Sequence, residues 1–315
     1  MKKNEQNMQG NLASISGAMP ETGSVGSGTP RKCGMTRRSL VAGAASAVMA
    51  LALLAGCGAT PKATDAGSAP KTAEDTSAAA TSKLIVGFDQ AYPPYGYVGD
   101  DGEYTGFDLD LARAVADELD WEVQLEAIDW EAKDALMDSG AINCIWNGFT
   151  MEGREDDYTF SDPYMLNAQV IVVRADSGIS DRAGLAGKTV VTQADSAAEK
   201  VLAEDAADLA ATFASLETIG EYNTAFMQLE SGAVDAVACD LSIARYQMSA
   251  KPDAYLMLDE YLSEESYAVG FKKGDTATAK KVTEALKKLY EDGTVEQIAA
   301  KYADQGLTMD NWQIK

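Results

Sequence analysis

From residue 83 onward, short runs of apolar residues alternate with segments in which apolar residues recur every three or four positions. Near-continuous apolar runs of this length are typical of strands that are covered on both faces. The pattern predicts seven strands, at Leu84–Asp89, Val123–Ile128, Ile142–Phe149, Val170–Arg174, Thr189–Gln193, Asp235–Asp240 and Tyr267–Phe271. Helices between such strands indicate an α/β protein with mostly parallel sheets.

Helical periodicity is clearest in three intervals between these strands. They are Phe107–Leu119, 130–139, which Asp129 would cap, and Thr276–Tyr290, which ends before Gly293. Seven strands in residues 83–315 fit two smaller lobes better than one sheet. Because ligands bind at the carboxyl ends of parallel strands, we expect a ligand cleft between the lobes.

The N-terminal residues have a different pattern, which predicts an export signal. Paired arginines at 37 and 38 precede the apolar run Leu40–Ala55, whose 16 residues are too few for a membrane span of about 20. The run ends in Leu54-Ala-Gly-Cys57, which resembles a lipoprotein box and implies cleavage before Cys57 and lipidation of its sulfur. An ordinary signal peptide with an incidental cysteine is the alternative. The sequence leaves open the twin-arginine or general export route, and Met1 or Met35 as the start.

Residues 58–82 contain no Leu, Ile, Val, Met or aromatic residue and cannot form a core. We therefore predict a signal peptide with lipobox at 1–57, a disordered tether at 58–82 and a folded part from 83 to 315. A flexible tether of this length would span roughly 25–30 Å.

Charge and composition exclude several classes of function. The chain has 26 Lys and Arg, 49 Asp and Glu and no histidine, which gives a net charge of −23. An acidic chain without a basic patch beyond its N-terminus argues against a nucleic-acid partner. The absence of histidine excludes Ser-His-Asp and Cys-His nucleophile systems and imidazole-dependent metal sites. We expect no cofactor and no metal. We also expect a site of permanent charges, whose ligand binding changes little between pH 6 and 8.

Cys144 and Cys239 lie in predicted strands of different lobes. We therefore expect buried free thiols, with a disulfide as the alternative.

Four stretches of the folded part carry a family resemblance when they are taken in order. They are Leu84–Tyr95 leading to Gly106–Leu111; Trp130 with Asn147–Thr150, Arg154 and Phe160–Tyr164; Leu185–Gln193 with Asp195 and Ser196; and Gly232–Asp240. Together they resemble the extracytoplasmic solute-binding proteins, family 3, of amino-acid ABC importers, which have the type II periplasmic-binding-protein fold. The resemblance covers essentially all of residues 83–315.

The resemblance implies a lobe 1 of residues 83–173 plus 268–315 and a lobe 2 of residues 174–267. Hinges are expected near 173–176 and 264–267. The protein would close its lobes on an amino acid and deliver it to an ABC permease and its ATPase. We expect a monomer that the lipid anchors to the membrane, at the cell surface or in the periplasm.

Three charged or polar residues suit the two ends of a free amino acid, whose charged groups are costly to bury unpaired. The guanidinium of Arg154 matches a carboxylate, and Ser196, at the start of a helix, suits an anion. Asp240 ends a strand and would accept the ammonium group. The alternatives are a surface arginine and plain helix caps at Ser196 and Asp240.

Other ligand-binding residues come from the resemblance. It implies that Gly148 and Thr150 complete the ammonium site, next to Asn147. Two features depart from the family pattern. Only three residues separate Thr150 from Arg154, where four are usual, and Asp195 replaces the glycine before Ser196, which puts a negative charge near the proposed anion site.

The side chain of the ligand would lie between aromatic walls formed by Tyr92, Tyr95 and Trp130. Each could instead be an ordinary core aromatic. Asp89 ends the first strand and could pair with a polar or basic ligand side chain. Asp108 and Asp110 are interpreted as structural residues at a helix start.

We expect a binding protein rather than an enzyme. A same-fold enzyme, such as a cyclohexadienyl-type dehydratase, would need a Glu or Lys as a general acid in the cleft, and no motif position offers one. A surface receptor lipoprotein without a transport role is a further alternative. The sequence does not name the amino acid, so polar, basic and cystine-like ligands all remain open.

Overall fold

The structure is a computed structural model that describes residues 82–315. The predicted signal peptide, the lipidation site Cys57 and the predicted tether up to residue 81 lie outside the described residues. Among the helices of 82–315, none combines the length and the apolar character that a membrane crossing requires.

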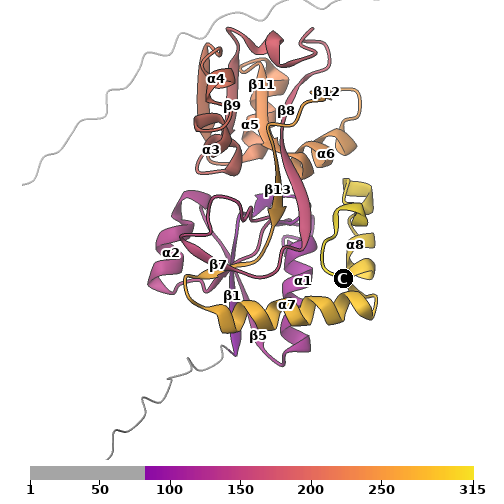
Figure 1. Cartoon of the computed structure of the whole chain (residues 1–315). Helices are drawn as coiled ribbons and strands as arrows, with labels where there is room; N and C mark the ends of the chain where they lie inside the picture. Colours follow the sequence, from indigo (N-terminus) through magenta and orange to yellow (C-terminus); the bar gives the residue numbers. More distant parts are fainter. Residues whose placement is uncertain (1–81) are drawn as a thin grey trace, which may run out of the picture. The chain divides into compact units, whose positions relative to one another are not determined.

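Lobe 1 is built on a five-stranded sheet with the order β5-β1-β6-β14-β7. Figure 1 labels β1, β5 and β7 of this sheet. Its strands are β1 (Lys83–Phe88), β5 (Glu122–Ala127), β6 (Cys144–Ile145), β7 (Tyr158–Phe160) and β14 (Gly270–Lys272). Its helices are α1 (Phe107–Glu118), α2 (Lys133–Ser139), α7 (Thr276–Glu291) and α8 (Thr294–Ala300), with the 3-10 turns η1 (Trp130–Ala132), η3 (Ala303–Gln305) and η4 (Met309–Asn311). A small separate sheet contains β2 (Ala91–Tyr92), β3 (Gly96–Val98) and β4 (Tyr104–Thr105).

Lobe 2 contains a six-stranded sheet with the order β10-β9-β11-β8-β12, in which β13 also pairs with β8. Its strands are β8 (Met165–Arg174), β9 (Thr189–Gln193), β10 (Ser215–Ile219), β11 (Ala236–Asp240), β12 (Tyr255–Met257) and β13 (Ser263–Tyr267). Its helices are η2 (Arg182–Leu185), α3 (Ala197–Ala203), α4 (Ala207–Ala210), α5 (Tyr222–Ser231) and α6 (Leu241–Ala250).

Strand β11 shows why the apolar runs are continuous. Ala236 and Ala238 pack into one core with α3, whereas Val237 and Cys239 pack into the other core with α5 and α6. Side chains of a strand alternate between its two faces, so a strand that is covered on both faces needs apolar residues throughout.

Both sheets are mixed, which corrects the expectation of mostly parallel sheets. Strand β1 runs parallel to β5 and β6, and β9 runs parallel to β10 and β11. In contrast, β8 is antiparallel to β11 and β14 is antiparallel to β6. Strand β8 is the first strand of the lobe 2 sheet along the chain, and the chain reaches it from lobe 1. Strand β14 is the first strand after the chain returns to the lobe 1 sheet, and the chain reaches it from lobe 2.

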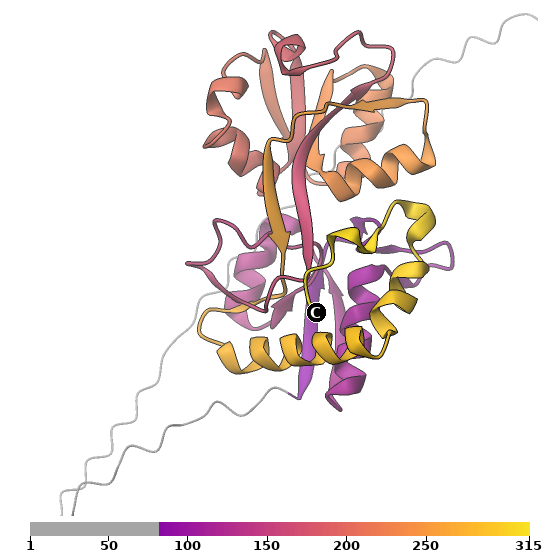
Figure 2. The ribbon, with the colours of Figure 1, turned by 45° about the vertical axis from the view of Figure 1, so that its right-hand side comes forward.

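Strands β8 and β13 join the lobes and lie side by side (Figures 1 and 2). They pair from Ser263 opposite Gln169 to Tyr267 opposite Met165. Because Gln169–Val173 already pair with β11, the sheet of lobe 2 begins before the predicted boundary at residue 173. The hinge near 173–176 stays a prediction. The second predicted crossing, 264–267, coincides with β13.

Several predicted elements are longer than the observed ones. The strand expected at Ile142–Phe149 is shortened to β6, and the residues after it turn away at Gly148, whose φ is +58°. The strand expected at Tyr267–Phe271 divides into the end of β13 and β14. Asp129 precedes η1 but its side chain makes no capping hydrogen bond, and α2 begins only at Lys133.

The cysteines of the folded part are free. Cys144 lies in β6 and Cys239 in β11, both buried, which confirms the expected free thiols.

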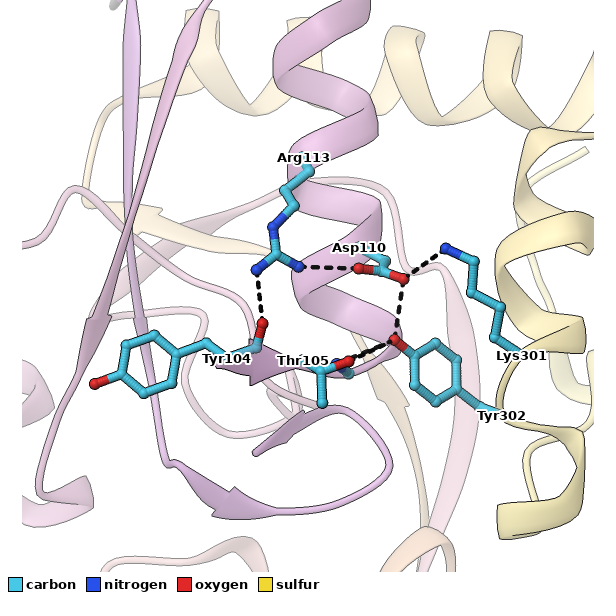
Figure 3. Close-up of polar contacts among 7 residues, drawn as sticks. Tyr104, Thr105, Asp110, Arg113, Lys301 and Tyr302 are labelled. Carbon is cyan, nitrogen blue, oxygen red and sulfur yellow. Dashed lines mark hydrogen bonds and ion pairs between the residues drawn. The ribbon is translucent and has the colours of Figure 1, made fainter. Parts of the chain in front are cut away.

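Asp110 fastens the C-terminal segment to α1 (Figure 3). Its Oδ1 accepts from Arg113 Nη1 at 2.9 Å, and its Oδ2 accepts from Lys301 Nζ at 2.9 Å and Tyr302 Oη at 3.0 Å. The same tyrosine hydroxyl accepts the backbone N–H of Gly106 at 3.1 Å. Asp110 thus has the structural role that we expected, because it ties the segment after α8 to the start of α1.

Candidate ligand-binding site

A cavity lies where residues of the two lobes meet. Its lining residues are Tyr92, Trp130, Asn147, Gly148, Phe149, Thr150 and Arg154 from lobe 1 and Gln193, Ser196, Ala197 and Asp240 from lobe 2. The structure thus brings together the predicted residues Tyr92, Trp130, Asn147, Gly148, Thr150, Arg154, Ser196 and Asp240. It leaves Asp89 and Tyr95 outside the lining.

Asp108 holds the loop Asn147–Thr150, which lines the cavity, in position. Its Oδ2 accepts the backbone N–H of Gly148 and the hydroxyl of Tyr164, both at 2.6 Å. Burial raises the pKa of Asp108 to about 7. At Gly148 a Cβ would lie 3.0 Å from the Tyr92 ring and 3.1 Å from the Tyr267 ring, so the loop needs glycine for space as well as for its positive φ.

Arg154 lies at the cavity wall in spite of its short loop. The loop turns back on itself, because Arg154 N donates to Met151 O and Arg154 Nη1 donates to Thr150 O, both at 3.0 Å. The guanidinium carbon lies 5.0 Å from the centre of the Phe149 ring. The guanidinium retains further N–H donors for an anion.

Asp195 does not leave an uncompensated charge beside the predicted anion site. Its carboxylate forms an ion pair with Lys133 Nζ, and Lys133 is itself 2% exposed. The Asp195 carbonyl accepts from Trp130 Nε1 at 3.2 Å and from Arg154 Nη2 at 3.5 Å. Its φ of +58° explains why glycine is usual at this position.

Ser196 is the N-cap of α3. Its Oγ accepts the N–H of Glu199 at 3.1 Å and lies 3.3 Å from Thr192 Oγ1. The plain capping interpretation is therefore correct, and the same residue also lines the cavity.

Asp240 is buried at the end of β11, and its side chain makes no capping bond to α6. Its Oδ1 accepts from Asn167 Nδ2 at 2.9 Å, Gln169 Nε2 at 2.8 Å and Tyr267 Oη at 2.9 Å. These donors fix the carboxylate in position, and they bring no positive charge to it.

The aromatic lining differs in part from the prediction. Tyr92 and Trp130 line the cavity, and Phe149 joins them. Tyr95 packs edge-on against Tyr267 and Phe107, with ring centres 5.3 and 6.0 Å apart, and is a core residue. Its predicted role as a cavity wall is not supported, because Tyr95 is not among the residues that line the cavity.

The family model for bacterial extracellular solute-binding proteins, family 3, matches residues 84–305. The chain belongs to this family. A similar curated protein is the L-cystine-binding protein TcyJ of Escherichia coli (strain K12), 28% identical over 228 residues, 71% of this chain and 84% of TcyJ.

Solved structures also resemble this solute-binding protein. One is an ABC uptake transporter substrate-binding protein from Streptococcus pneumoniae with bound histidine, with a TM-score of 0.68, 33% identity and coverage of 70% of this chain and 92% of that one. Another is the ancestral amino acid-binding protein AncCDT-1, a precursor of cyclohexadienyl dehydratase, with a TM-score of 0.63, 29% identity and coverage of 70% and 95%. The two-lobed fold of the family, which we expected from the sequence, is confirmed.

Asp89 of the solute-binding protein lies next to the cavity, in a second, larger one that shares Trp130 with it. Its Oδ1 accepts Ala91 N at 2.8 Å, and its Oδ2 accepts Gln193 Nε2 from lobe 2 at 2.7 Å. Burial raises the pKa of Asp89. The other acidic residues of this second cavity are Asp129, Glu131 and Glu221.

Glu265, which no sequence motif indicates as a site residue, is only 4% exposed. Its Oε1 accepts from Thr150 Oγ1 at 2.9 Å, Asn167 Nδ2 at 2.7 Å and Gln169 Nε2 at 2.8 Å. Burial, and then the charge of Asp240, raise the pKa of Glu265 to about 8. A carboxyl group with a raised pKa therefore lies beside a site that we expected to consist of permanent charges. The only sequence feature that points to Glu265 is its position two residues before Tyr267, because residues two apart in a strand lie on the same face.

Proposed function

We propose that this protein is the amino-acid-binding component of an ABC importer, which closes its lobes on a free amino acid and presents it to the permease. One observation carries the proposal. The same cavity has Arg154 from lobe 1 and Asp240 from lobe 2 in its lining, so it offers one fixed positive and one fixed negative charge. A zwitterion with both groups buried needs such a pair.

The carboxylate of the ligand would bind Arg154, with the N-cap Ser196 next to it. The guanidinium is held from behind by the carbonyls of Thr150 and Asp195, which orients its remaining donors. Lys133 neutralises the Asp195 carboxylate and so keeps this end of the cavity favourable for an anion.

The ammonium group would bind Asp240, with Gly148 and Thr150 completing the site. The protein donors to Asp240 are neutral amide and hydroxyl groups. An ammonium ion would therefore supply the missing positive charge, in a charge-assisted hydrogen bond.

Closure follows from the placement of these residues on two lobes. The ion pair Lys133–Asp195 and the hydrogen bond from Lys200 Nζ to Gly153 O, at 2.6 Å, join the lobes next to the cavity. In a hinge closure such contacts form together with the ligand contacts, so the ligand and the protein contacts stabilise the same closed state.

The ligand side chain would lie between Tyr92, Trp130 and Phe149 and point toward Asp89. The acidic neighbouring cavity favours polar, basic or cystine-like side chains, as do the ligands in the names of the similar proteins. We further propose a monomer that a lipid on Cys57 anchors to the membrane through the tether of residues 58–82, outside the cytoplasm.

A same-fold enzyme is the second candidate, and Glu265 is the observation that favours it. A carboxyl group that keeps its proton at neutral pH can act as a general acid. The similarity to a precursor of a dehydratase gives this candidate a context. Glu265 is not among the residues that line the cavity, however, so binding without reaction is the better account.

A thermal-shift screen of the purified protein tests the proposal. The panel contains the twenty amino acids, L-cystine and cyclic carboxylic acids, because a ligand that binds only the folded state raises the melting temperature. We expect an increase with one or a few amino acids and no product from any cyclic acid. No increase with any amino acid would contradict the proposal, and formation of a product would favour the enzyme.

A further inference from the structure

Two buried carboxylates, Asp240 in the cavity lining and Glu265 outside it, share the same hydrogen-bond donors. Asn167 Nδ2 and Gln169 Nε2 each donate to Asp240 Oδ1 and to Glu265 Oε1, at 2.7–2.9 Å. Asp240 and Glu265 are both 4% exposed. Neither forms an ion pair with a lysine or arginine within residues 82–315.

The combined charge of Asp240 and Glu265 therefore has no compensating lysine or arginine within residues 82–315. Two carboxylates that share a desolvated site repel each other, and one of them retains a proton unless a cation is present. Glu265 Oε1 already accepts three hydrogen bonds, including that of Thr150, so a proton on Glu265 belongs on Oε2.

We propose that Glu265 is a positioning residue that keeps a proton while the cavity is empty and releases it to solvent when the ligand's ammonium group binds at Asp240. The carboxylic acid becomes a carboxylate, the proton passes to the buffer, and the ammonium group provides the compensating charge. The inference rests on the proposed function, since it requires a cationic group at Asp240.

Within residues 82–315, the side chains that face Glu265 include one further carboxylate, that of Asp240, and no lysine or arginine. The side chains that face it are Asn167 and Gln169 on β8, Thr150 after β6, Asp240 on β11 and, on its own strand, Tyr267. Burial raises the pKa of Tyr267 well above its usual range, so this tyrosine stays neutral. The cation Arg154 contacts the carbonyl of Thr150 and has a fixed charge.

Asp108 is another buried carboxyl group with a raised pKa, in its case about 7. It contacts Gly148 and Tyr164 rather than Glu265. A comparison of proton release between the wild type and Glu265→Gln cancels any contribution from Asp108 or from the ligand itself. Glu264→Gln is a matched control, because Glu264 lies next to Glu265 on β13 and is exposed.

The test is calorimetric titration at pH 6.5 in buffers of different ionisation enthalpy. The ligand is the compound that binds most tightly in a panel of the twenty amino acids plus L-cystine. We expect the wild type and Glu264→Gln to release about one proton more per bound ligand than Glu265→Gln. The affinity of the wild type should increase by up to about tenfold per pH unit from pH 5.5 to 7.5, and that of Glu265→Gln should change much less.

Equal proton release in the wild type and Glu265→Gln would overturn the inference while leaving the proposed function intact. If Glu265→Gln does not fold, a wild type that binds without releasing a proton, and with an affinity independent of pH, would overturn the inference as well. Absence of binding by every amino acid would overturn the proposed function and this inference with it.

Discussion

Lys133 on α2 and Asp195 after β9 form an ion pair that joins the two lobes at the edge of the cavity. Lys133 is almost completely buried, whereas Asp195 is 52% exposed. The lysine ammonium also lies 5.3 Å from the centre of the Trp130 ring, and Trp130 donates to the Asp195 carbonyl. A residue that departs from the family pattern thus contributes a contact between the lobes.

Asp195→Asn should weaken ligand binding by roughly tenfold, because the buried ammonium of Lys133 loses its partner in the closed state. Calorimetry with the cognate amino acid measures this effect. The control is Asp162→Asn, which removes an exposed ion pair with Lys287 inside lobe 1 and should leave the affinity unchanged. Equal affinities for both variants would show that the ion pair does not assist closure.

Arg154→Ala should cost roughly 2–5 kcal/mol of binding free energy, since the ligand carboxylate would be buried without a partner. Arg154→Lys should recover only part of this loss, because an ammonium group cannot reproduce the planar fork. Arg182→Ala, which removes a lobe 2 arginine that pairs with Glu260, is the control for loss of an arginine elsewhere. Unchanged affinity in Arg154→Ala would refute the assignment of the carboxylate site.

Gly148→Ala should destabilise the protein by about 1–3 kcal/mol, through an unfavourable φ and contact with two tyrosine rings. Gly178→Ala is a matched control, since Gly178 has a φ of +74° and no atom within 4 Å of an added Cβ. Urea unfolding of both variants separates the contact from the backbone cost. A loss in Gly148→Ala no larger than that in Gly178→Ala would mean that the rings move aside freely.

Glu265 should make the folded protein less stable as the pH rises from about 4.5 to about 8. Its pKa is higher in the folded than in the unfolded state, so the folded state binds more protons in this window and stability decreases with pH. Glu265→Gln should reduce the difference in unfolding free energy between pH 5 and 8 by more than about 1 kcal/mol, whereas Glu264→Gln should not. Identical pH profiles for the wild type and Glu265→Gln would contradict the raised pKa of Glu265.

The presence of Arg154 and Asp240 in one cavity could be predicted from the sequence, because each residue belongs to a short continuous motif. Arg154 follows the Asn147–Thr150 stretch, and Asp240 ends an apolar strand. Phe149 and Gln193 lie within the same motifs and line the cavity, although their positions in the sequence do not predict this. Spacing along the chain identifies a loop at the cavity, but not which of its side chains faces inward.

Glu265 could not be found in this way, because its partners come from strands that are far apart in the sequence. Asn167 and Gln169 on β8 reach it only through the pairing of the two strands that join the lobes. The same strands give both sheets their antiparallel members, which the alternation of strands and helices does not reveal.

A crystal structure of the protein with the amino acid that gives the largest thermal shift tests the central claim most directly. The account predicts one ligand in the cavity between the lobes, with its carboxylate on Arg154 and its ammonium group on Asp240. A ligand bound elsewhere, or one whose carboxylate and ammonium groups contact neither residue, would contradict it.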